Sequence, residues 1–276
     1  MAGNLPNHVI PRTDVYRLRA TSVDQEYRIS VALPRGYGSQ ASRYPVLYLL
    51  DADYGFGTLV EGHRLMSMGQ ELAEILIVGI GYPAEDLLET RLVRTRDLTP
   101  SVDQETLQAL SDERLAEGGP TFIGGGRQFH AFIRRQLMPF IEDRYSVDSA
   151  DRGIAGCSYG GLFAAYCLLR HPETFSRYLI CSPSLAWDDG VIFRYERECA
   201  RQSRELPVQV FLSVGGCEAP DEVKAVKRLA ATLRRRRYEG LRLTTRVFAD
   251  EIHRSVPASA MWRGLRELYG SSRVPD

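Results

Sequence analysis

A serine lies between two glycines in the stretch Gly156-Cys157-Ser158-Tyr159-Gly160. The pattern Gly-x-Ser-x-Gly alone is weak, because a chain this rich in Gly and Ser contains it by chance about one time in ten. Its context is stronger: Arg152–Ala155 predicts a short buried strand, and Gly160–Arg170 predicts an apolar helix. Strand, sharp turn and helix is the setting in which such a serine acts as a nucleophile. A glycine-rich turn without chemistry is the alternative interpretation.

A serine hydroxyl is a poor nucleophile unless a base removes its proton. Where the serine occupies such a turn, its acid and its histidine follow it in chain order. Of the five histidines, only His253 follows the last strand-like run, Leu241–Phe248, and it lies in a polar loop. The sequence therefore predicts His253 as the base, although a lone loop histidine is usually just solvated.

The acid is expected directly after the preceding strand. Val208–Val214 predicts that strand, and Glu218 follows it within a few residues. Its carboxylate would fix the imidazole tautomer and stabilise the imidazolium. Asp221 and Glu222 are the alternatives, but their position fits the first turn of the next helix, where carboxylates complement the helix dipole.

Further motifs accompany the serine over nearly the whole chain, from Asp14 to Tyr269. They are Tyr44-Pro45-Val46-Leu47-Tyr48-Leu49-Leu50-Asp51-Ala52-Asp53, Val78-Gly79-Ile80-Gly81-Tyr82-Pro83, Arg94-Thr95-Arg96-Asp97-Leu98-Thr99-Pro100, Gly124-Gly125, Pro139-Phe140-Ile141-Glu142, Ser182-Pro183-Ser184 and His253 with Ser255-Val256. With these motifs the chain resembles the putative-esterase family of α/β-hydrolases, and most closely the siderophore esterases that cleave enterobactin-type catecholate trilactones.

The resemblance implies a serine esterase that forms an acyl-enzyme on Ser158 and needs no cofactor or metal. One oxyanion donor is expected to be the backbone N–H of Tyr159, the residue after the nucleophile. The resemblance implies the backbone N–H of Asp53 as the second donor, whereas plain turn chemistry is the alternative for this loop.

Three positions depart from the family pattern. Cys157 stands where a histidine is common, Ala186-Trp187 where two tryptophans are common, and Gly215-Gly216-Cys217-Glu218 where Gly-Glu-x-Glu is common. Feruloyl and acetyl-xylan esterases, S-formylglutathione hydrolases and mycolyl transferases belong to the same family, so a different acyl ester, or acyl transfer, remains an alternative. A non-catalytic binding module is a further alternative, but such relatives normally lack the serine or the histidine.

An iron–catecholate substrate is anionic and aromatic, which suits arginine and aromatic side chains. Arg94 and Trp187 are therefore predicted to bind the substrate. The alternative for Arg94 is a structural ion pair with Asp97.

Composition narrows the class of protein. The 276 residues carry 35 basic and 35 acidic side chains, so bulk charge predicts neither a nucleic-acid nor a membrane partner. The run Arg234–Arg237 fits the basic end of an amphipathic helix better than a phosphate site. The first residues lack an apolar signal-peptide core, and the five cysteines are scattered, which predicts free thiols and a cytoplasmic location. The sequence does not predict an oligomeric state.

The order of elements predicts an α/β fold with a doubly wound, mostly parallel sheet and an antiparallel hairpin at Asp14–Leu33. A single domain is expected over residues 1–276. Two inserts, at about 81–120 and 188–205, are expected to flank the active site, the first of them irregular. The remaining expected elements are strands at Pro45–Leu50, Ile75–Ile80 and Tyr178–Cys181, and helices at Leu59–Met68, at Phe129–Tyr145 with a kink at Pro139, at 221–238 and at 257–269.

Overall fold

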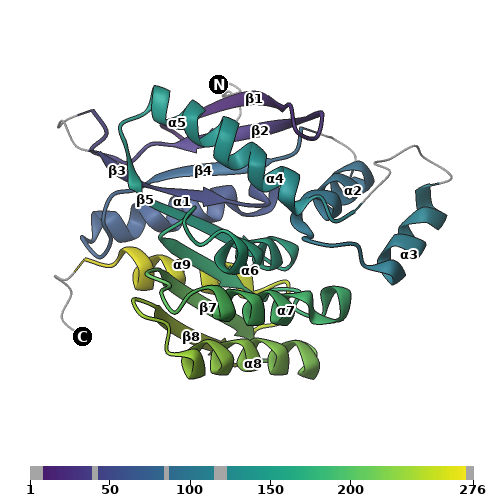
Figure 1. Ribbon diagram of the computed structural model, residues 1–276. Helices are drawn as coiled ribbons and strands as arrows, with labels where there is room; N and C mark the ends of the chain where they lie inside the picture. The colour runs from purple at the N-terminus through teal and green to yellow at the C-terminus, as the bar shows by residue number, and fades with distance from the viewer. Residues whose placement is uncertain (1–8, 39–42, 84–86, 115–122, 272–276) are drawn as a thin grey trace.

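The computed structural model describes residues 9–38, 43–83, 87–114 and 123–271 (Figure 1). Residues 1–8 lie outside this part. They belong to the amino-terminal segment for which the sequence predicts no signal peptide. Eight strands form one sheet in the order β1-β2-β4-β3-β5-β6-β7-β8. They are β1 (Thr13–Ala20), β2 (Gln25–Ala32), β3 (Tyr44–Leu49), β4 (Leu76–Gly81), β5 (Val147–Cys157), β6 (Arg177–Cys181), β7 (Gln209–Gly215) and β8 (Arg242–Phe248).

The strand directions confirm the predicted sheet. β1 and β2 pair antiparallel as the expected hairpin, and β2 pairs antiparallel with β4. All pairs from β4 to β8 are parallel, so the carboxyl ends of these strands meet at one edge. Loops that follow the central parallel strands are therefore the ones that can share a site.

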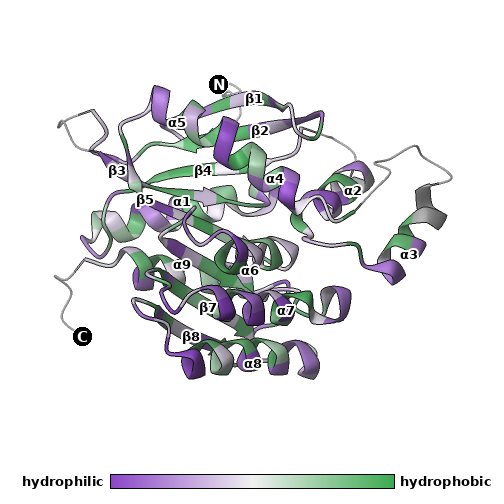
Figure 2. Ribbon diagram, viewed as in Figure 1, coloured by the Kyte–Doolittle hydropathy of each residue, from purple (hydrophilic) through white to green (hydrophobic). Residues whose placement is uncertain are grey.

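Helices cover both faces of the sheet, whose strands are largely apolar (Figures 1 and 2). They are α1 (Ala52–Met68), α2 (Leu87–Leu98), α3 (Gln104–Arg114), α4 (Gly126–Phe132), the π-helical turn η1 (Ile133–Leu137), α5 (Met138–Arg144), α6 (Tyr159–Arg170), α7 (Trp187–Gln202), α8 (Pro220–Arg236) and α9 (Val256–Tyr269). Within the described residues, no helix is long and apolar enough to cross a membrane.

Two apolar clusters hold these layers together. Side chains alternate between the faces of a strand, so Val46 and Tyr48 of β3 enter one cluster while Leu47 and Leu49 enter the other. The first cluster packs the helices from α4 to α8, and the second packs α1 and α9. The central strands are thus buried on both sides, as their continuous apolar runs predicted.

The insert after β4 is more regular than expected. It contains α2 and α3, although its residues 84–86 and 115–120 lie outside the described part. The sequence predicted an irregular insert because the segment is polar. Several of its polar groups are, however, buried and hydrogen-bonded inside the fold. Asp97, for example, accepts a hydrogen bond of 2.6 Å from the Tyr27 hydroxyl, and the Thr99 hydroxyl donates to the Thr95 carbonyl at 2.7 Å.

Three other helices also differ from expectation. α1 begins seven residues earlier than predicted, directly after Asp51. The kink expected at Pro139 takes the form of the π-helical turn that precedes it, since proline has no N–H for a regular helical bond. α7 occupies most of the second insert, which was expected to hold only a short helical run, although its backbone is left-handed at Asp188, Asp189 and Gly190 near its start.

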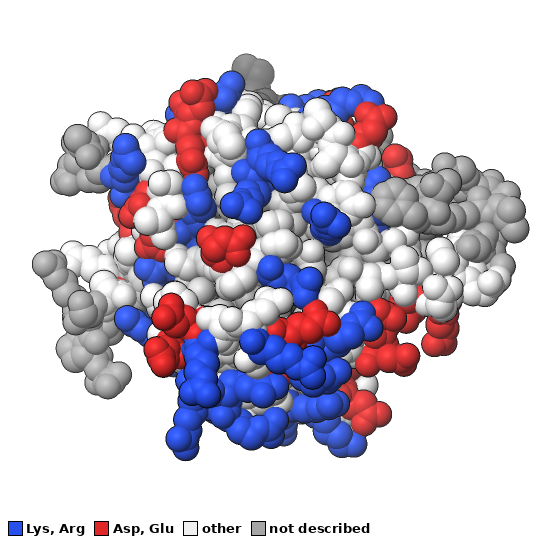
Figure 3. Space-filling model, viewed as in Figure 1, with Lys and Arg blue, Asp and Glu red and all other residues white. Residues whose placement is uncertain are grey.

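Basic side chains gather over α7 and α8 (Figure 3). The run Arg234–Arg237 ends α8 as predicted, and Arg237 adopts a left-handed conformation just past the helix. Arg236 is held by the buried carboxylate of Glu196 through bonds of 2.7 and 3.0 Å. This part of the run therefore ties α8 to α7.

Two stacked imidazoles make stability depend on pH. The rings of His130 and His171 lie 4.0 Å apart, and His130 Nε2 is 3.0 Å from the Thr174 hydroxyl. Burial and then the neighbouring His171 lower the pKa of His130 to about 3, and burial also lowers the pKa of His171. Unfolded histidine titrates near about 6.5, so below that pH the unfolded chain binds protons that the native state does not.

We therefore expect stability to fall as the pH drops from about 6.5 toward 4. His130→Gln retains a polar side chain beside Thr174 but cannot titrate, so it should reduce this fall. The measurement is the urea midpoint of both proteins at pH 7 and pH 4.5. An equal fall in both proteins would show that His130 does not contribute to it.

Candidate active site

Ser158 occupies a strained turn between the last residue of β5 and the first residue of α6. Its φ of 58° and ψ of −119° are unfavourable for a side chain with a Cβ atom and cost about 1–3 kcal/mol. The Ser158 N–H donates to the Cys181 carbonyl at 3.1 Å, and its own carbonyl accepts from the Leu162 N–H at 2.9 Å. The start of α6 and the end of β6 therefore fix the serine at the carboxyl edge of the sheet.

The glycines of the motif are required by close backbone contacts. A Cβ atom on Gly156 would lie 2.4 Å from the carbonyl of Gly160, and one on Gly161 would lie 2.7 Å from the carbonyl of Cys181. Larger residues at these positions would push the helix away from the strands. The context inferred from the sequence, strand then turn then helix, is confirmed.

His253 and Glu218 form a hydrogen-bonded pair. His253 Nδ1 lies 2.6 Å from Glu218 Oε2. The other carboxylate oxygen of Glu218 accepts from the Ser182 hydroxyl at 2.5 Å and from the Gly215 N–H at 2.7 Å. The Glu218 side chain is fully buried, whereas that of His253 is 39% exposed. Three hydrogen bonds thus fix the carboxylate, and the carboxylate orients a ring whose other edge remains accessible.

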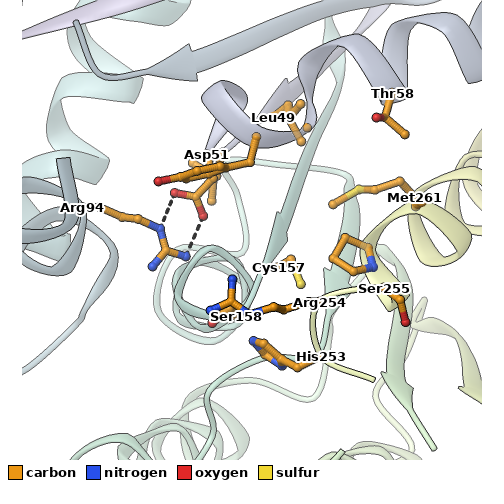
Figure 4. Close-up of a pocket in the computed structure, with 15 residues that line it drawn as sticks. Leu49, Asp51, Thr58, Arg94, Cys157, Ser158, His253, Arg254, Ser255 and Met261 are labelled. Carbon is orange, nitrogen blue, oxygen red and sulfur yellow. Dashed lines mark hydrogen bonds and ion pairs between the residues drawn. The ribbon is translucent and has the colours of Figure 1, made fainter. Parts of the chain in front are cut away.

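Ser158 and His253 line the same pocket (Figure 4). The Ser158 hydroxyl is 3.4 Å from the hydroxyl of Ser184, and among the described residues no hydrogen bond joins it to His253. Such bonds are often long without substrate and shorten when the substrate binds. The geometry brings together the serine and the histidine that the sequence predicted, with Glu218 behind the histidine.

The pocket has a volume of about 370 Å³ and lies between α1, α9 and the loop of His253. Its walls are mainly apolar, with Leu49, Tyr54, Pro257 and Met261 among the lining residues. Cys157 also lines it, and its thiol lies 3.5 Å from that of Cys181. All five cysteines are free thiols, as predicted.

Arg94 reaches the pocket from α2, but its charge is already paired. It binds Asp51 through two hydrogen bonds of 2.6 and 2.9 Å, and it lies 5.2 Å from the ring centroid of Tyr159. Burial lowers the pKa of Arg94, but the ion pair and hydrogen bonds with Asp51 raise it by more, so the guanidinium stays charged. The alternative partner Asp97 is wrong: Asp97 pairs with Arg96 at 2.7 Å, because these two buried side chains face Tyr27.

Trp187 is buried behind Tyr159 and is not among the residues that line the pocket. The two rings lie 5.3 Å apart edge to face, and the indole N–H donates to the Ser101 carbonyl at 3.1 Å. A role of Trp187 in substrate binding remains a prediction.

Asp53 lies in the first turn of α1, with its carboxylate directed away from the pocket. The carboxylate accepts from the Tyr82 N–H at 2.8 Å and pairs with Arg28. From the same turn, Asp51 and Tyr54 line the pocket instead. The backbone N–H groups of a first helical turn have no partner within the helix, so the predicted role of the Asp53 N–H is compatible with this placement.

Among the residues that the structure describes, one group of side chains could offer ligands to a metal. Atoms of Glu218, Glu222 and His253 lie within 4.8 Å of one another. Glu218, however, already has hydrogen bonds on both of its oxygens, one of them to His253 Nδ1. A metal would have to replace that bond, so the arrangement favours an oriented imidazole.

Comparisons with known proteins identify the family of the chain. A family profile described as Putative esterase matches residues 20–262. The chain belongs to this family. It is therefore a carboxylic ester hydrolase, and its sheet is that of an α/β-hydrolase fold.

Several relatives of the esterase have known names. Ferri-bacillibactin esterase BesA of Bacillus subtilis (strain 168) is 31% identical, over 93% of this chain and 89% of the relative. Siderophore triacetylfusarinine C esterase of Aspergillus fumigatus is 28% identical, over 84% and 80%. The crystal structure of BES protein from Bacillus cereus superposes with a TM-score of 0.84 at 25% identity, covering 98% of this chain and 99% of that chain.

Sequence reasoning missed several residues of the esterase's site. Ser182, which holds Glu218, was noted only within the family motif, although a serine directly after a parallel strand could have suggested a role. Asp51 belongs to the loop for which the sequence offers an oxyanion donor or plain turn chemistry, and nothing in the sequence shows that α2 folds back onto it. Arg254 lines the pocket, but an arginine in a polar loop carries no signal of its own in the sequence.

We expect the activity and stability of the esterase to depend on the charges of Arg94 and Asp51 together rather than on either one alone. In Arg94→Gln the Asp51 carboxylate would remain unpaired next to the elbow and oppose the negative charge of the transition state. We expect kcat/KM for a small neutral ester to fall about tenfold or more, with a lower melting temperature. Adding Asp51→Asn removes the second charge and should restore part of both losses. Additive losses in the double variant would contradict this coupling.

Proposed function

We propose that the esterase acts through an acyl-enzyme, with Ser158 as nucleophile, His253 as base and Glu218 as the acid that orients His253. The observation that carries the proposal is the 2.6 Å bond between Glu218 and His253 at the pocket into which the strained Ser158 faces. An esterase needs no more than this set and two oxyanion donors for both half-reactions.

The first half-reaction would form the acyl-enzyme. Ser158 Oγ attacks the ester carbonyl carbon while His253 Nε2 takes the hydroxyl proton. The resulting imidazolium donates through Nδ1–H to the buried Glu218 carboxylate, which stabilises its charge. The tetrahedral intermediate then collapses, and His253 gives its proton to the departing alcohol. The acyl group remains on Ser158.

The second half-reaction repeats these steps with water. His253 takes a proton from the water as its oxygen attacks the acyl carbonyl, and it returns a proton to Ser158 as the acid leaves. The developing oxyanion would be held by the backbone N–H groups of Tyr159 and Asp53. Each such donor is worth about 10²–10³ in rate.

We propose siderophore-like or aromatic acyl esters as the substrates. Support comes from the names of the relatives, which are esterases of ferri-bacillibactin and triacetylfusarinine C. The pocket volume of about 370 Å³ lies at the lower end of small-molecule sites, so it suits one acyl arm of a cyclic ester. The free thiols suit an enzyme that works in the reducing cytoplasm.

The second candidate is a feruloyl, acetyl or other short-chain acyl esterase, or an acyltransferase. The mainly apolar pocket wall would accept such acyl groups as well. Rates on enterobactin with and without iron, on methyl ferulate and on 4-nitrophenyl acetate would separate the two. A preference of less than about tenfold for the triester, in kcat/KM, would favour the second candidate. A non-catalytic binding module would hydrolyse none of these esters.

Ser158→Ala should abolish hydrolysis of 4-nitrophenyl acetate while the fold and the melting temperature remain. We expect kcat to fall by about 10⁴-fold or more, and His253→Ala to be nearly as damaging, because the two side chains act as one unit. Steady-state kinetics and circular dichroism on each variant provide the measurement. Activity of Ser158→Ala within tenfold of wild type would exclude Ser158 as the nucleophile.

The acid can be distinguished from its neighbour on α8. Glu218→Gln should lower kcat by about 10²–10⁴-fold, because the amide cannot stabilise the imidazolium. Glu222→Gln is the matched control: it changes an exposed carboxylate near the same histidine and should cost little. A larger loss in Glu222→Gln, or in Asp221→Asn, would reassign the acid.

A further inference from the structure

The charged side chains that line the pocket differ in whether another group forms an ion pair or hydrogen bond with them. Asp51 and Arg94 neutralise each other through two hydrogen bonds. His253 is bonded to the Glu218 carboxylate. Arg254 also lines the pocket, and within the part of the chain that the structure describes its guanidinium has no ion pair or hydrogen bond. Among the lining residues, Arg254 is thus the charge left without a counter-ion.

Arg254 is also placed close to the reacting groups. Arg254 follows His253 directly, so the two Cα atoms are about 3.8 Å apart. Its side chain is long enough to reach different positions at the entrance of the pocket. Figure 4 shows Arg94 reaching in from the left and bonded to Asp51, whereas Arg254 comes from the chain next to His253. Arg254 is exposed, and its guanidinium can therefore move to meet a ligand without breaking a hydrogen bond or an ion pair.

An apolar surface adjoins this charge. Tyr54 from α1 is 67% exposed and lines the same pocket as Pro257 and Met261 from α9. A large exposed aromatic side chain and an unpaired guanidinium that line one pocket offer two complementary contacts, one for an apolar or aromatic stem and one for an anion. Neither contact needs a change in the Ser158 machinery.

We propose that Arg254 is a specificity-determining residue that binds a negative charge on the acyl part of the substrate. The preferred substrates would be esters whose acyl group has an apolar or aromatic stem that lies against Tyr54 and Met261 and carries an anionic group several bonds from the carbonyl. This inference rests on the proposed function, since it concerns which esters reach Ser158. It places the anion contact on Arg254 rather than on Arg94.

A matched pair of esters tests the proposal. 4-Nitrophenyl hemiglutarate and 4-nitrophenyl valerate share a leaving group and chain length, but only the first carries a carboxylate at the end of its acyl chain. The quantity to compare is the ratio of kcat/KM for the anionic ester to kcat/KM for the neutral one. In Arg254→Ala we expect this ratio to fall about fivefold, mainly through a higher KM for the anionic ester.

Two further variants sharpen the result. Arg254→Lys keeps the charge and should retain most of the wild-type ratio, whereas Arg254→Glu should lower the ratio below that of Arg254→Ala. Arg246→Ala is the matched control, because this exposed arginine on β8 does not line the pocket, and it should leave the ratio unchanged. Raising the salt concentration should reduce the wild-type ratio and leave that of Arg254→Ala nearly constant.

An unchanged ratio in Arg254→Ala, or equal losses on both esters, would overturn the proposal while leaving the serine mechanism intact. If wild type hydrolysed neither ester and did not react with a fluorophosphonate, the proposed function itself would have failed, and the inference with it. The melting temperature of Arg254→Ala should equal that of wild type, because the side chain has no partner to lose.

Discussion

The close approach of β5, α6 and the end of β6 around Ser158 is the constraint on which the rest of the site depends. Gly156 lies against Gly160 with no room for a Cβ atom, and the Cys181 carbonyl binds the Ser158 N–H. The turn costs about 1–3 kcal/mol, which the packed helices and the parallel sheet must offset. In return it projects the hydroxyl from the sheet edge and leaves the Tyr159 N–H at the start of a helix, where it has no intrahelical partner.

The negative charges of two carboxylates next to this turn are compensated by different groups. Glu218 is buried and bonded to Ser182, Gly215 and His253, so it holds the ring of the base in one orientation. Asp51 lies near Gly160 and would place a negative charge beside the oxyanion of the proposed mechanism, but Arg94 neutralises it. The insert that carries α2 therefore contributes to the electrostatics of the site as well as to its walls. Under the proposed mechanism, this ion pair keeps an uncompensated negative charge away from the oxyanion.

The sequence predicted the parts of this arrangement that depend on local pattern and chain order. The elbow, the parallel sheet and the positions of His253 and Glu218 follow from apolar periodicity and from which loop follows which strand. Contacts that depend on how the insert folds back could not be predicted, because several side chains could have paired with Arg94. The helical nature of α2 was hidden as well, since polar groups such as Asp97 are buried only where partners from distant strands meet them.

The central claim is that one serine becomes covalently acylated with the help of an oriented histidine. The most direct measurement is peptide mapping by mass spectrometry after reaction with a fluorophosphonate, in wild type and in His253→Ala. The account predicts a single adduct, on Ser158, that forms rapidly in wild type and very slowly in His253→Ala. An adduct on another residue, or labelling of Ser158 at the same rate in both proteins, would contradict it.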